Sequence, residues 1–130
     1  MNDRPGWKVD FVSHDAIGVV EALFEDVYLT NASDVQEWDR QVRAQLDVFE
    51  GKVELLISLD GLHVKPAAAR RFGECRAAVL SEYASCSFRY GADAWTATSI
   101  STSSVLDGAD ANLFPTREEA LEALLNRRKR

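Results

Sequence analysis

A nearly continuous apolar run from Val53 to Asp60 (VELLISLD) narrows the possible folds of this chain more than any other segment. Its length suits a strand, and the lack of alternation between apolar and polar residues is typical of a strand that is covered on both faces. We expect it at the centre of a sheet with at least partly parallel neighbours, because such strands are joined by helices that cover both faces. Gly61 ends the run.

The segments before this run predict two strands and a helix. Residues 7–12 and 17–24 carry strand patterns on either side of a short polar turn, which indicates an antiparallel hairpin. Residues 27–30 are expected to continue the second strand past a bulge. A helix is predicted over 33–49, because Ser33 and Gln36 have the spacing of a capping box and apolar residues follow at helical intervals.

The segments after the run predict further helices and strands. Pro66 suits the first turn of a helix, and a strand is expected over 86–90. Residues 112–114 look extended, and Thr116 with Glu119 forms a second capping box that opens a last helix. The residues of the stretch from 93 to 106 do not decide its secondary structure. Its Ser and Thr content favours strand or loop, whereas its larger side chains are spaced so that they would lie close to one face of a helix. The order predicts a layered α/β domain.

The composition is that of one globular domain. The chain has 130 residues, of which 46% are hydrophobic and 28% charged, and this hydrophobic share excludes a disordered chain. Seven Gly, three Pro and two Cys exclude collagen-like and disulfide-rich scaffolds. No apolar stretch approaches the roughly 20 residues that span a bilayer, and the first residues lack the apolar core of a signal peptide. We therefore expect one domain over 1–130, no membrane span and a cytoplasmic location with reduced thiols.

The charge distribution argues against nucleic acid as a partner. The net charge is −6, although residues 127–130 are all basic, so the rest of the chain is more acidic still. An acidic body repels phosphate backbones. We interpret the basic tail, 126–130, as the last turn of a helix whose cations offset the helix dipole. A basic tail for an acidic partner is the alternative.

Three short stretches carry a resemblance to a known family. Glu54–Leu62 is similar to the central strand of STAS domains, the family of the bacterial anti-sigma-factor antagonists, and Phe88–Gly91 is similar to the end of the next strand. Asn112–Ala120 resembles their closing segment. Within that group the chain is most similar to uncharacterised bacterial proteins described as STAS/SEC14-like. The stretches are mostly structural, so the match argues for fold more than for function.

The resemblance implies a fold and a class of function. It implies a single-domain STAS-like (SpoIIAA-like) α/β fold, with a four- to five-stranded mixed sheet and helices packed against it, including a helix over 93–106. It also implies a non-enzymatic regulatory or protein-interaction module without cofactor. STAS antagonists are phosphorylated on a serine at the start of the helix after the central strand, but residues 63–69 contain no Ser or Thr. We therefore expect no such phosphorylation.

Five polar residues beyond the ends of two strands form the candidate ligand-binding site: Asp60, His63, Arg89, Tyr90 and Asp93. Ligands of open α/β sheets bind beyond the carboxyl ends of strands, and an arginine there can hold a carboxylate or phosphate. The alternative function is therefore a binding domain for a small, possibly lipid-like or anionic, ligand. A third possibility is an enzyme in which Asp60 and His63 handle a proton. A purely structural role, with capping and ion pairing at the strand ends, is the plainest interpretation.

No metal site, cofactor or catalytic nucleophile is predicted. His14 and His63 lie in separate loops, and Cys75 and Cys86 are too far apart in the sequence for a zinc-binding pair. A cysteine nucleophile with His63 as its base has no motif around it. A protein partner or a homodimer is expected, because the first hairpin leaves an edge strand on which Trp7 and Phe11 suit a symmetric interface. A buried apolar cavity would favour the ligand-binding function, and a flat exposed apolar patch the protein-interaction function.

Overall fold

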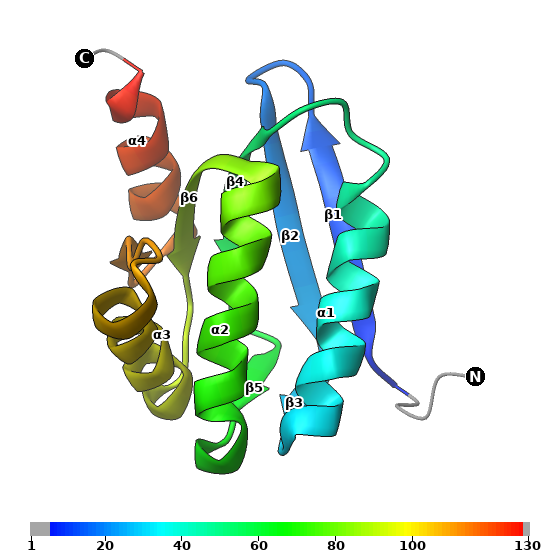
Figure 1. Ribbon diagram of the computed structural model, residues 1–130. Coiled ribbons are helices and arrows are strands. Elements are labelled where there is room, and N and C mark those ends of the chain that lie inside the picture. Colours follow the sequence, from blue (N-terminus) through cyan, green and yellow to red (C-terminus); the bar gives the residue numbers. More distant parts are fainter. Residues whose placement is uncertain (1–5, 129–130) are drawn as a thin grey trace.

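The computed structural model describes residues 6–128, in which strands alternate with helices (Figure 1). The strands are β1 (Lys8–His14), β2 (Val19–Glu25), β3 (Val27–Leu29), β4 (Val53–Ser58), β5 (Leu62–Val64), β6 (Ala84–Tyr90) and β7 (Leu113–Phe114). The helices are α1 (Ala32–Leu46), α2 (Pro66–Tyr83), α3 (Ala94–Asp107) and α4 (Arg117–Arg127). The predicted α/β class is confirmed.

The main sheet has five strands in the order β1-β2-β4-β6-β7. β1 and β2 are antiparallel, whereas β2 with β4, β4 with β6 and β6 with β7 are parallel. β4 is therefore the middle strand with two parallel neighbours, as its apolar run predicts. Leu55 and Leu56 are 2% and 0% exposed although they point to opposite faces, which confirms that both faces of this strand are covered.

Helices cover the two faces of the sheet unequally. α1 and α2 lie across one face, and α3 lies beside α2 (Figure 1). α4 packs on the other face, where Ala120 and Leu124 join a core cluster with Leu56, Cys86 and Phe88. Among residues 6–128, no helix is both long enough and apolar enough to cross a bilayer.

The end of α4 is tied back to the sheet. The guanidinium of Arg128 donates to Glu54 (2.8 Å) and to the carbonyl oxygen of Ile17 (2.6 Å). These contacts fit the interpretation of the basic end as part of a helix terminus. Lys129 and Arg130, the remainder of the predicted basic tail, lie outside the described residues.

Two short parallel strands, β3 and β5, form a second sheet that the sequence pattern did not predict. The expectation that residues 27–30 extend the second strand is wrong, because Asp26 has a φ of 55° and turns the chain out of β2. The N–H of Val27 then donates to the carbonyl of Gly61 (2.9 Å). Gly61 has to lack a side chain here, since a Cβ atom would lie 2.1 Å from the carbonyl oxygen of Phe24.

The helix starts show which capping signals were correct. Thr116 caps α4, because its hydroxyl accepts from the N–H of Glu119 (3.2 Å), as predicted. The predicted cap of α1 at Ser33 is wrong, because Asn31 accepts from the N–H of Asp34 (3.0 Å) and the helix begins at Ala32. The helix expected over 93–106 from the STAS resemblance is present as α3.

Candidate functional site

The five polar residues predicted at the strand ends do not converge on one site. Consecutive side chains of a strand point to opposite faces, so Arg89 and Tyr90 of β6 are separated by the sheet. Arg89 points to the face covered by α2, whereas the hydroxyl of Tyr90 donates to Glu21 on the α4 face (2.8 Å). Asp60 is exposed in the turn after β4. Only His63 and Asp93 are brought into contact, with 2.6 Å between Nδ1 and Oδ2.

The His63–Asp93 pair links β5 to the start of α3. Asp93 also caps α3, because its other carboxylate oxygen accepts from the N–H of Thr96 (2.7 Å). Burial raises the pKa of the Asp93 carboxyl, but the hydrogen bonds from Thr96 and His63 outweigh this and lower it overall. Tyr28 stacks on the His63 ring, with 4.7 Å between the centroids.

This pair has the parts of a proton-transfer dyad without a reacting group. A carboxylate that is hydrogen-bonded to one imidazole nitrogen fixes the orientation of the ring. Asp93 fills this position rather than the predicted Asp60. Within residues 6–128 the His63 ring makes no hydrogen bond to a hydroxyl or thiol. The geometry therefore supports a structural role for the pair.

A second polar cluster surrounds Glu21 on the α4 face of the sheet. Arg117 of α4 holds the Glu21 carboxylate with two hydrogen bonds of 2.9 Å each, and Tyr90 and His14 are each 2.8 Å from it. Burial raises the pKa of this carboxyl, but the bonds from Arg117, Tyr90 and His14 together lower it to about 2. This charge is fully compensated, and the cluster fastens α4 to the sheet.

The other face of the sheet holds two buried arginines. Arg89 of β6 is 1% exposed and Arg76 of α2 is 4% exposed. Arg89 donates to the carbonyl oxygens of Asp110 (2.8 Å) and Ala111 and to the hydroxyl of Ser87. Arg76 donates to the hydroxyl of Ser103 (2.6 Å) and to the same carbonyl of Asp110. The shared carbonyl keeps the two guanidinium groups side by side.

These two positive charges have no direct counter-charge. Among residues 6–128, no carboxylate lies within 4.0 Å of either guanidinium, and all their hydrogen bonds go to neutral oxygens. Burial lowers the pKa of Arg76 to about 10, and burial together with the neighbouring Arg76 lowers that of Arg89 to about 9; the more distant carboxylate of Asp110 acts against both shifts, and that of Asp107 against the shift of Arg76. Both groups are thus protonated at neutral pH. A buried charge in this state is costly unless it is paired.

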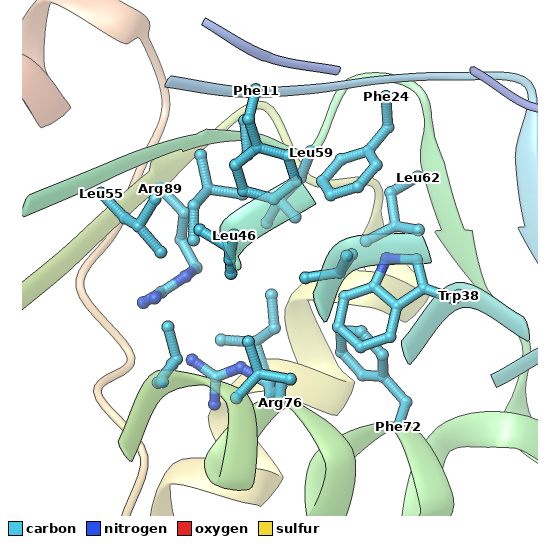
Figure 2. A pocket seen from close by; sticks show the side chains of 16 residues that line it. Phe11, Phe24, Trp38, Leu46, Leu55, Leu59, Leu62, Phe72, Arg76 and Arg89 are labelled. Carbon is cyan, nitrogen blue, oxygen red and sulfur yellow. The ribbon is translucent and has the colours of Figure 1, made fainter. Parts of the chain in front are cut away.

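The arginine pair, Arg76 and Arg89, borders an apolar cavity between the sheet and the helices α1 and α2 (Figure 2). The cavity is narrow, with a volume of only about 40 Å³. Apart from the arginine pair, its lining is hydrophobic: Phe11, Ala22, Phe24, Trp38, Val42, Leu46, Leu55, Ile57, Leu59, Leu62, Phe72, Val79, Leu80 and Ile100. Figure 2 shows the two guanidinium groups near each other at one end of the cavity, Arg89 reaching from the sheet and Arg76 from helix α2.

Two polar residues of these clusters were missed from the sequence, although their positions carried a signal. Arg76 lies on the apolar face of its helix, since it follows Phe72 by four residues and precedes Val79 by three. Glu21 lies between apolar residues within β2, whereas the other charged residue of this strand, Glu25, is at its end. A charged residue on a buried face needs a partner, so both positions indicate a polar contact.

Neither cysteine lines this cavity. Both are buried free thiols, and burial is the main cause that raises their pKa values. The part of the chain that the structure describes contains no group of three or more side chains suited to hold a metal ion.

Comparison with known proteins gives no family. No protein-family model matches the chain. A search of curated proteins likewise finds no match. The STAS resemblance therefore stays a prediction. Any proposal about function has to rest on the geometry of the chain.

Proposed function

We propose that this chain binds a small anionic molecule with an apolar body in the cavity between the sheet and helices α1 and α2. One observation carries the proposal: two buried guanidinium groups, bonded only to neutral oxygens, border an otherwise hydrophobic cavity. An anion between them would supply the missing counter-charge. Charge-assisted bonds from a guanidinium to a carboxylate are among the strongest hydrogen bonds in proteins.

The cavity lining favours a carboxylate with a slender hydrocarbon portion. Ligand sites are mostly apolar with a few placed polar groups, as here, and the aromatic and aliphatic lining offers no further charge to a ligand with several ionic groups. Such sites usually hold about 300 to 1,000 Å³, far more than the 40 Å³ of open space in this cavity. The lining side chains therefore have to move apart when the ligand enters, and an unbranched chain requires the smallest movement.

This proposal keeps one residue of the site predicted from the sequence. Arg89 remains a ligand-binding residue, and Arg76 of α2 joins it from a position that was not predicted. The function is the small-ligand alternative, and it requires no chemical step.

A protein-interaction module of STAS type is the second candidate. Trp95 and Leu106 of α3 are 61% and 60% exposed and border a groove between α2 and α3. Exposed apolar side chains in such a position are typical of partner contacts. The predicted homodimer has less support at its expected place, because Trp7 and Phe11 pack against the core.

The binding proposal is tested by comparing decanoate with decanol, which has the same chain length and no charge. We expect decanoate, below its micellar concentration, to raise the melting temperature in a dose-dependent way, since a ligand of the folded state stabilises it. Decanol should have a much smaller effect. Arg76→Met should abolish the decanoate effect, because methionine fills similar apolar space without the charge.

Arg71→Met is the matched control, because Arg71 lies on the same helix and is exposed. It should respond to decanoate like the unmodified protein. Equal responses to decanoate and decanol, or an undiminished decanoate effect in Arg76→Met, would contradict the proposal.

A further inference from the structure

The cavity lining contains one further polar group besides the arginine pair, and within the described part of the chain this group has no hydrogen-bond partner. Trp38 of α1 lines the cavity and is 5% exposed. Among residues 6–128, its indole nitrogen Nε1 has no hydrogen-bond partner. Buried donors are rarely left without a partner, so this one needs an explanation.

The position of Trp38 separates its N–H group from the arginine pair. Phe24 and Phe72 flank the indole, with ring centroids 6.5 Å and 5.2 Å from it. Figure 2 shows Trp38 on one side of the cavity and the arginine pair on the other, with hydrophobic side chains between them. A single elongated molecule in the cavity would therefore meet positive charge at one end and the indole N–H toward the other.

We propose that Trp38 Nε1 is a second polar subsite, and that the ligand is a carboxylate with a neutral hydrogen-bond acceptor remote from its carboxyl group. The inference rests on the proposed function. An indole N–H only donates, so the ligand group that meets it has to accept: a hydroxyl, carbonyl or ether oxygen. A second carboxylate does not fit there, because the surrounding lining offers no positive charge to offset its burial.

The experiment compares decanoate with a series of hydroxydecanoates in which the hydroxyl group is moved along the chain. Dissociation constants are measured by calorimetry for the unmodified protein and for Trp38→Phe, which removes the donor but keeps an aromatic ring. We expect at least one hydroxydecanoate to bind about 2- to 10-fold more tightly than decanoate, the gain of one net hydrogen bond. In Trp38→Phe this ratio should fall to about one. Because the ratio is taken within one protein, any loss of packing cancels.

A second measurement does not depend on the variant. The indole Nε1–H resonance of Trp38, followed by nitrogen–proton NMR, should move downfield with the preferred hydroxydecanoate more than with decanoate. The inference is overturned if no hydroxydecanoate binds better than decanoate. It is also overturned if the preference persists in Trp38→Phe. Failure of every carboxylate to bind overturns the proposed function as well.

Discussion

At the scale of single residues, the two faces of the sheet differ in whether a buried charged side chain has an oppositely charged partner. On the α4 face, the carboxylate of Glu21 is met by Arg117, Tyr90 and His14. On the opposite face, Arg76 and Arg89 meet only neutral oxygens. A buried charge in a direct ion pair contributes to folding, whereas buried charges without a direct ion-pair partner cost stability and are typical of a binding site.

Glu21→Gln tests the compensated charge through its pH dependence. The pKa of this carboxyl is about 2 in the folded protein against an ordinary value of 4.5, so its contribution to stability is present above pH 4.5 and is lost as the pH falls toward 2. We expect Glu21→Gln to lower the free energy of unfolding by roughly 3 kcal/mol at pH 6. The difference from the unmodified protein should shrink below pH 4.5. Urea unfolding over a pH series measures it.

Glu25→Gln is the control for this series. Glu25 lies on the same strand but is exposed, and its partner Lys8 is 3.7 Å away. Its replacement should change stability by less than about 1 kcal/mol at any pH. A difference for Glu21→Gln that stays constant from pH 6 to pH 2 would show that the Glu21 charge does not stabilise the fold.

The residue scale also shows what the sequence could predict about the site. Arg89 was identified from its place near a strand end, but the grouping with Tyr90 ignored the alternation of side chains along β6, which the sequence itself dictates. The apolar face of its helix indicated that Arg76 is buried, but its pairing with Arg89 could not be predicted because it depends on how α2 packs against β6. The contact between His63 and Asp93 joins residues 30 positions apart and also had no local signal.

At the scale of elements, the edge strand β1 is protected by a side chain of α1. The amide of Gln45 accepts from the N–H of Phe11 (3.0 Å) and donates to the carbonyl of Val9. These backbone groups point away from β2 and would otherwise be free to pair with another strand. Blocking an edge in this way prevents pairing between copies of the chain.

Gln45→Ala should therefore weaken the protein and promote its association. We expect a loss of about 1–2 kcal/mol in the free energy of unfolding, because two backbone groups lose their partner. We also expect a concentration-dependent rise in mass by light scattering. Gln36→Ala, an exposed position on the same helix, should leave both properties unchanged. A Gln45→Ala protein with unchanged mass and stability would show that the edge is protected by other means.

The positions of helices and strands were predictable where the hydrophobic pattern was clear or where a proline or a capping residue marks the end of an element. The apolar run of β4, Pro66 at the start of α2 and the capping box of α4 all have local causes. β3 and β5 were missed because three-residue strands carry no period, and they pair only because Asp26 redirects the chain. The Ser- and Thr-rich α3 has a weak apolar pattern, so its residues alone did not decide between helix and strand.

At the scale of the whole molecule, the unequal cover of the sheet explains where a ligand would lie. α4 packs closely on one face, while α1 and α2 enclose the narrow cavity on the other. The arginine pair lies between that cavity and the 108–112 segment, whose carbonyls hold the two guanidinium groups. An anion at this place would compete with these carbonyls for the same N–H donors. Ligand binding should therefore change the hydrogen bonds of the arginine pair directly.

The most direct test is nitrogen–proton NMR of the arginine side chains during titration with decanoate. The Nε–H resonances of Arg76 and Arg89, assigned from Arg76→Met and Arg89→Met, should shift in a saturable way, while that of exposed Arg71 stays in place. Saturable binding that leaves the resonances of Arg76 and Arg89 unmoved, or no binding, would contradict the proposed role of the arginine pair.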